Sequence, residues 1–195
     1  VGMHLTATAP ARLDGVTLRL AHLDNAGSRA CIQAGFEAST AYISLSPGLV
    51  CMFDSPSGTG LTHQDIGAAG FSAHQLWNAA AAQLTEKAQR PHGAEFLVRC
   101  PSVALGGTDL PRGFEVDGHG IPAAWWLAHP RPFSLLHRHF EAVLRPGTGL
   151  VYASHNGREL FVFDADASEL SARLPGADVW TYSVGFPLLR SADSH

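Results

Sequence analysis

The chain has 195 residues, of which 46% are hydrophobic, and it carries a formal net charge of -4. This size and apolar content are enough for a buried core and exclude a largely disordered chain. The basic residues are scattered along the sequence, and only Lys87 is a lysine, so no basic patch indicates nucleic-acid binding.

The sequence also lacks the patterns that direct a protein to a membrane. No apolar run approaches the roughly 20 residues of a membrane-spanning helix, and no secretory leader pattern opens the chain. We therefore expect a cytoplasmic protein without a membrane partner. Cys31, Cys51 and Cys100 lie far apart in apolar or strand-like neighbourhoods, which predicts buried free thiols in preference to a disulfide.

The first half of the chain predicts antiparallel strands followed by a helix. Apolar and polar residues alternate over 16–23, as in a strand with one wet face. Residues 42–45 and 49–53 flank a Ser-Pro-Gly turn and predict a hairpin. Ser72 and Gln75 form a capping-box pattern before an alanine-rich run, which predicts a helix over 73–88. Residues 95–100 predict another strand.

The second half predicts two helical pieces, a hairpin and a final strand. Pro122 suits the first turn of a short helix over 122–128, and a longer helix follows the His129-Pro130-Arg131-Pro132 segment. The two prolines predict a kink or corner between these helices. Residues 150–153 and 160–163 enclose an Asn-Gly turn, which strongly favours a hairpin. A brief helix capped by Asp166 and a strand over 179–184 complete the chain.

These elements together predict an α+β fold with a largely antiparallel sheet packed by a few helices. We expect a single domain that spans residues 1–195. Two subdomains with a seam near residues 54–70 are the alternative. Either arrangement requires the helix over 73–88 to cover the sheet with its apolar face.

Three segments in the second half of the chain resemble a known family. They are FSAHQLWNAAAAQL, GFEVDGHGIPAAWWLAHPRPFSLLHRHFEAVL and GLVYASHNGRELFVFDAD, which ends near Asp164. In order and spacing they are similar to the C-terminal half of the YtpQ-like family of uncharacterised bacterial proteins. The resemblance covers about half of the chain. It implies a fold and a bacterial origin, and it carries no established activity to this protein.

The sequence contains no strong catalytic signature. A nucleophile elbow, HExxH, CxxC, an EF-hand loop and a dinucleotide fingerprint are all missing, so we predict no catalytic residue and no cofactor. Two weaker alternatives are a nucleophile at Cys100-Pro101-Ser102 beside a distant histidine and a phosphate cradle at residues 54–60. The second lacks the lysine that a P-loop requires.

A metal site is the alternative that the histidines support. His129, His137 and His139 are the candidate ligands, since imidazole binds zinc and other transition metals. Residues two apart on a helix point in different directions, so His137 and His139 would need help from His119 and Asp117 across the proline corner. The competing interpretation is ordinary helix-surface histidines, with His137 paired with Glu141.

The tryptophan pair is the main indication of function. Trp125 and Trp126 point to different faces of a helix or strand, so we expect only one of them to enter the core. The other is either covered by the proline corner or exposed as an interface anchor, a role that tryptophan favours. With Arg131 and Phe133, the pair forms the predicted interaction residues.

These observations favour a non-catalytic protein-interaction module of accessory, regulatory or immunity type. Its protein partner is unidentified, and a homodimer is one arrangement that fits. The alternative function is a small metal-dependent hydrolase or metal-binding protein.

Overall fold

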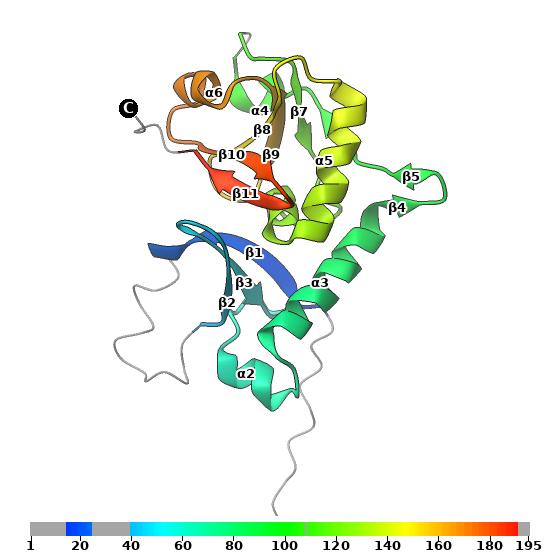
Figure 1. Cartoon of the computed structure of the whole chain (residues 1–195), viewed down its shortest axis with the longest axis vertical. Helices are drawn as coiled ribbons and strands as arrows, with labels where there is room; N and C mark the ends of the chain where they lie inside the picture. Colours follow the sequence, from blue (N-terminus) through cyan, green and yellow to red (C-terminus); the bar gives the residue numbers. More distant parts are fainter. Residues whose placement is uncertain (1–14, 25–39, 108, 191–195) are drawn as a thin grey trace, which may run out of the picture.

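The computed structural model describes residues 15–24, 40–107 and 109–190, which form two main antiparallel sheets and a small two-stranded one, with helices between and around them (Figure 1). The α+β fold predicted from the sequence is confirmed. Within the described ranges, none of the helices combines the length and the apolar character that a membrane crossing requires.

The smaller sheet contains the first three strands of the chain in the order β1-β3-β2. These are β1 (Thr17–His22), β2 (Tyr42–Ser46) and β3 (Leu49–Asp54). All six residues of the central strand β3 are buried. Helix α2 (His63–Ala68) follows, and then α3 (Ala73–Ala88), which packs on the sheet through Leu76 and Leu84. The predicted capping box of Ser72 and Gln75 begins α3.

The larger sheet has six antiparallel strands in the order β11-β10-β8-β9-β7-β6. Its strands are β6 (Val98–Arg99), β7 (Gly113–Val116), β8 (Leu150–Ser154), β9 (Leu160–Asp164), β10 (Asp178–Ser183) and β11 (Phe186–Leu189). A small hairpin of β4 (Gln89–Arg90) and β5 (Gly93–Ala94) projects from the body between α3 and this sheet (Figure 1). Because they are first and last in the strand order, β11 and β6 are the two edge strands of the six-stranded sheet.

Each face of the six-stranded sheet has its own cover. The short 3-10 helix η2 (Ala123–Ala128) and α5 (Pro130–Leu144) pack on the face that carries Tyr152 and Trp180. Helix α6 (Ala167–Arg173) packs on the other face, against Phe161 and Phe163, near α4 (Ser102–Leu105). Helix η2 also contacts β1 of the smaller sheet, so it lies between the two sheets.

Direct polar contacts join the two sheets. His22 Nε2 lies 2.7 Å from Asp178 Oδ2, and Ser46 Oγ donates a hydrogen bond of 2.7 Å to the carbonyl of Pro187. One hydrophobic cluster contains residues of both sheets. It also contains Ile66 of α2, which lies in the 54–70 segment where the alternative placed a subdomain seam.

The structure refines three of the sequence predictions. The corner between the two helices is shorter than expected, because α5 begins at Pro130 and only its N-cap, His129, separates it from η2. Proline is tolerated in the first turn of a helix because its missing N–H would have no partner there. The strand predicted over 95–100 is reduced to Val98–Arg99. The final strand turns back at Val184 and forms β11, which the sequence analysis did not predict.

The β10–β11 turn contains a strained residue. Val184 has φ +49° and Gly185 has φ +91°, so both central residues of the turn have a left-handed backbone. A β-branched residue at positive φ is unfavourable, whereas asparagine followed by glycine suits this kind of turn. The Val184 side chain is 86% exposed and contributes little packing.

We expect Val184→Asn to raise the free energy of unfolding by about 1 kcal/mol, because it relieves this backbone strain. Urea denaturation followed by circular dichroism measures the change. Val143→Asn is the matched control, since Val143 is an exposed valine with helical backbone in α5. Equal or lower stability of Val184→Asn than wild type would contradict the prediction.

Candidate functional site: a groove beside the edge strand β6

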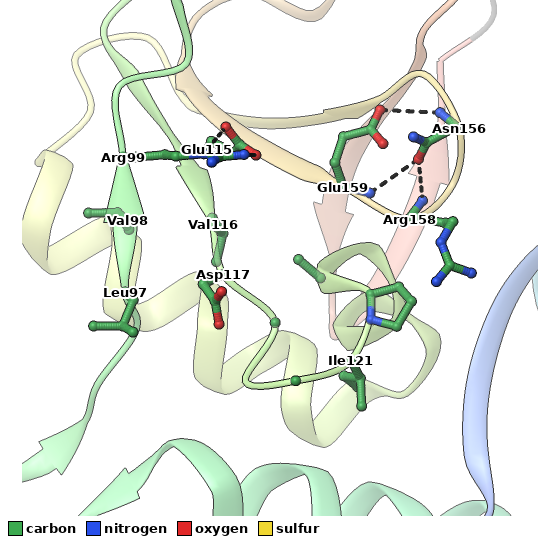
Figure 2. Close-up of a pocket in the computed structure, with 14 residues that line it drawn as sticks. Leu97, Val98, Arg99, Glu115, Val116, Asp117, Ile121, Asn156, Arg158 and Glu159 are labelled. Carbon is green, nitrogen blue, oxygen red and sulfur yellow. Dashed lines mark hydrogen bonds and ion pairs between the residues drawn. The ribbon is translucent and has the colours of Figure 1, made fainter. Parts of the chain in front are cut away.

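A groove of about 660 Å³ lies at the β6 edge of the six-stranded sheet (Figure 2). Its walls come from β6 and β7, from the loop that leads into η2, and from the β8–β9 turn. The lining residues are Leu97, Val98, Arg99, Glu115, Val116, Asp117, Gly118, Gly120, Ile121, Pro122, Ala123, Asn156, Arg158 and Glu159. The volume is within the range of ligand-binding sites in proteins.

Strand alternation places Arg99, Glu115 and Asp117 on one face of the sheet. Arg99 lies opposite Glu115 in the β6–β7 pair, and Leu97 and Asp117 follow two residues away on the same face. Glu115 in turn lies opposite Phe161 of β9, whose face is covered by α6 further along the sheet. The groove is therefore the end of this sheet face that α6 leaves open.

Arg99 and Glu115 form a bidentate ion pair in the groove. The Arg99 guanidinium donates from Nε and Nη2 to the two carboxylate oxygens of Glu115, whose side chain is only 10% exposed. Fork-shaped pairing of this kind fixes both side chains more firmly than a single contact. The pair consequently forms a rigid, internally neutral floor.

The loop after β7 is held in one conformation by close packing. A Cβ atom at Gly118 would lie 1.9 Å from the carbonyl oxygen of Ile121, so only glycine fits there. Trp126 Nε1 donates to the carbonyl of Gly118, and Asp117 Oδ1 accepts from the backbone N–H of His119, which has φ +57°. The wall that this loop forms is therefore defined by the buried tryptophan behind it.

The opposite wall contains the cation of Arg158, which lies over an aromatic ring. The Arg158 guanidinium carbon lies 5.6 Å from the centroid of the Trp125 ring, and Arg158 makes no ion pair within the described part of the chain. Glu159 next to it accepts hydrogen bonds from the backbone N–H groups of His155 and Asn156. The Ala124 N–H donates a hydrogen bond to the Arg158 carbonyl, which fixes the backbone of Arg158.

The outer rim of the groove is apolar and ends in an open strand. Leu97 is 60% exposed and Val98 is 43% exposed. The Asp117 N–H donates to the Leu97 carbonyl. Because backbone groups alternate in direction along a strand, the N–H and carbonyl groups of Leu97 and Arg99 both point to β7. The N–H and carbonyl of Val98 must then point to the open side. An edge strand with exposed apolar side chains is a common site for pairing with another chain.

The predicted interaction residues lie mostly inside the protein. Trp126 and Phe133 are fully buried, and Trp125 is 8% exposed beneath Arg158. The expectation that only one tryptophan enters the core was wrong, because η2 lies between two sheets and is covered on all sides. Neither Trp126 nor Phe133 offers surface to a partner. Arg131 is exposed at the start of α5, away from the groove.

The predicted metal ligands do not come together. Among the described residues, no group of three or more His, Cys, Asp or Glu side chains is arranged to hold a metal ion. His129 is fully used as the cap of α5: its Nδ1 accepts from the Arg131 N–H, and its Nε2–H faces Asn78 Oδ1 at 3.3 Å. His129, His137 and His139 therefore do not form the single metal site that the sequence predicted.

The other two histidines pack against different aromatic rings. His137 stacks on Tyr182 with ring centroids 3.9 Å apart, and its Nδ1 lies 2.8 Å from the Tyr152 hydroxyl. Burial lowers the pKa of His137 and raises that of Tyr152, so both groups are neutral. The Tyr152 hydroxyl then donates a hydrogen bond to His137 Nδ1. His139 packs on Phe96 at a centroid distance of 5.1 Å. His137 also faces Glu141 at 3.5 Å, as predicted.

The thiols differ from one another. Cys51 is buried in β3, and burial raises its pKa, as expected for an inert core residue. Cys100 is exposed, so the prediction of burial was wrong for this residue. Ser102 Oγ lies 3.0 Å from its sulfur and lowers its pKa, and none of the described histidines is hydrogen-bonded to it. Cys31 lies outside the described residues.

The groove residues were missed by the sequence analysis. Leu97, Val98 and Arg99 were assigned only to a strand, because the sequence does not reveal that this strand is at the edge of a sheet. Glu115 carried a signal: a charged residue between Phe114 and Val116 in a strand-like run requires a partner when buried. Arg158 lies in a turn pattern that gives no indication of the ring beneath it.

Comparisons with protein-family models, with curated proteins and with solved structures gave no match to this chain. The resemblance to the YtpQ-like family therefore stays a prediction. The functional argument depends on the geometry of the groove alone.

His129 should make the stability of the protein depend on pH. Burial and the Arg131 charge lower its pKa to about 4, below the ordinary value of 6.5. The unfolded chain then binds a proton before the folded protein does. Stability from this residue is complete above pH 6.5 and is lost as the pH falls towards 4, by on the order of 2 to 3 kcal/mol.

We expect His129→Asn to flatten the dependence of unfolding free energy on pH between 6.5 and 4, because asparagine also caps a helix but does not titrate. Denaturant titrations at a series of pH values measure the difference between the two proteins. His92→Asn, in the exposed β4–β5 turn, is the control and should leave the slope unchanged. The same slope in His129→Asn as in wild type would refute the assignment.

Proposed function

We propose that this protein is a non-catalytic binding module and that the groove beside β6 holds an extended segment of a partner protein. The observation that carries the proposal is the open strand edge: exposed Leu97 and Val98 border a groove with a fixed backbone. Strand addition at such an edge supplies main-chain hydrogen bonds, and nearby pockets select side chains.

The charges of the groove support binding more than catalysis. Arg99 and Glu115 neutralise each other, and Glu159 is hydrogen-bonded to backbone N–H groups of its own turn. No nucleophile with an adjacent base lines the groove. Asp117 and Arg158 keep charges without an ionic partner in the described structure, so they are available to orient a bound chain.

A photo-cross-linking amino acid at position 97 tests this proposal. We expect a defined covalent adduct with a protein when the labelled chain is irradiated in an extract of its source cells. The matched control carries the same label at Val143, which is 51% exposed on α5 and is not among the residues that line the groove.

The cross-linked adduct identifies the partner, and the affinity of that partner for the chain can then be measured. Once the partner is identified, we expect Leu97→Asp to weaken its binding by about tenfold or more, since a charge replaces the exposed apolar contact. Isothermal titration calorimetry with purified partner gives the value. Equal labelling at positions 97 and 143, or labelling at neither, would overturn the proposed function.

A further inference from the structure

The β8–β9 turn in the wall of the groove contains an asparagine followed by a glycine (Figure 2). We infer that Asn156 is a site of spontaneous covalent modification, at which the backbone nitrogen of Gly157 displaces the side-chain amide and the residue becomes aspartate or isoaspartate. The modification requires no ligand in the groove, so it is independent of the proposed function.

Hydrogen bonds fold the Asn156 side chain back over the turn. Its Oδ1 accepts from the backbone N–H of Arg158 at 2.8 Å and from that of Glu159 at 3.2 Å (Figure 2). An asparagine that bonds the second residue after it closes a ring of the same kind as a backbone turn. The side-chain carbonyl carbon Cγ and the Gly157 nitrogen both belong to this ring, and its closure keeps them close together.

The same two donors make Cγ of Asn156 a better electrophile. They draw electron density from Oδ1, and they are in place for the negative charge that Oδ1 gains when a nucleophile adds to Cγ. Oriented donors of this kind stabilise a tetrahedral intermediate without having to reorganise.

The nucleophile is the backbone nitrogen of Gly157, which has no Cβ beside it to obstruct the attack. The reaction must break the hydrogen bond of 2.9 Å that the Gly157 N–H donates to Ser154 Oγ. Asn156 is exposed and Gly157 is half-buried, so a base from the solvent can reach the turn and remove the proton.

The reaction balances with water as the co-reactant. A solvent base takes the Gly157 N–H proton, the nitrogen forms a bond to Asn156 Cγ, and the Cγ–Nδ2 bond breaks as the solvent returns a proton to the departing ammonia. The product is a five-membered succinimide. Water then opens this ring: attack at Cγ gives aspartate, and attack at the backbone carbonyl carbon gives isoaspartate.

Asn78 provides a comparison within the same chain. It lies in α3, where its Nδ2 donates to the His74 carbonyl. The residue after it is Ala79, whose nitrogen has a Cβ beside it and lies in regular helix. Between these two asparagines we therefore assign the reaction to Asn156, and Asn25 lies outside the described residues.

Either product changes the wall of the groove. Both place a carboxylate where the amide was, two residues before Arg158, and so add negative charge to the lining. Isoaspartate also carries the main chain through its Cβ and lengthens it by an extra atom. That atom displaces the backbone of Arg158, whose carbonyl accepts from the Ala124 N–H and whose guanidinium lies over Trp125.

Peptide mapping by mass spectrometry measures the conversion while the purified full chain is incubated at mildly alkaline pH. We expect the Asn156 peptide to become a mixture of aspartate and isoaspartate, and to do so faster as the pH rises. The Asn78 peptide should convert at less than about a tenth of that rate. Ion-exchange chromatography of the whole protein should show the matching gain of negative charge.

Gly157→Ala should slow the conversion by about tenfold or more, because the added Cβ obstructs the nitrogen. Gly176→Ala is the matched control. Gly176 has φ +80° and Gly157 has φ +69°, and a Cβ at either position meets no atom within 4 Å apart from the chain neighbours. Both substitutions strain the backbone in the same way, but only Gly157 follows an asparagine, so the control should leave the rate unchanged.

Any of four results would overturn the inference: an Asn156 peptide that stays unconverted, conversion of Asn78 at an equal rate, an equal effect of the two alanine substitutions, or aspartate without isoaspartate. The last result would indicate direct hydrolysis of the amide, which forms no succinimide. Circular dichroism checks that both alanine variants fold. If one does not, the pH dependence and the isomer mixture of the wild-type chain decide.

Discussion

The burial of η2 between two sheets is the constraint on which the rest of the structure depends. All six residues of this 3-10 helix are buried, and Trp126 within it is inaccessible to solvent. Trp77 of α3 reaches across to donate to the Ala128 carbonyl, and its ring lies 4.2 Å from that of His129. Large aromatic side chains provide the greatest apolar burial per residue, so this junction gives the two sheets a common core.

The same constraint determines where the groove is and why it is rigid. Trp126 fixes the Gly118 turn from behind, and the Ala124 N–H fixes the backbone of Arg158 from below. Two of the groove walls are thus extensions of the core. The third wall, β6, has fewer restraints: it pairs only with β7 among the described residues. A binding surface that combines two fixed walls with an unpaired strand needs little reorganisation when a partner adds to it.

Local signals accounted for most of the elements, whereas sheet order and burial depended on long-range contacts. The capping box at Ser72, the Asn156-Gly157 turn and the cap at Asp166 each act within a few residues, so the sequence alone predicted them. The position of β6 at an edge depends on β9, which lies far along the chain and pairs with the other side of β7. The burial of Trp125 was predicted wrongly for a related reason. Sequence periodicity indicates on which face of a helix a residue lies, but it does not indicate whether a second layer of the protein covers that face.

The link between His22 and Asp178 has a consequence for synthesis of the chain. These residues lie 156 positions apart, and the contact joins the first described strand to one of the last. Helix α3 covers part of the apolar surface of the β1-β3-β2 sheet, and η2, which is translated about 70 residues after β3, covers another part next to β1. During translation this three-stranded sheet therefore emerges from the ribosome before η2 exists, and the apolar side chains that η2 later covers are available to chaperones until the second half of the protein arrives.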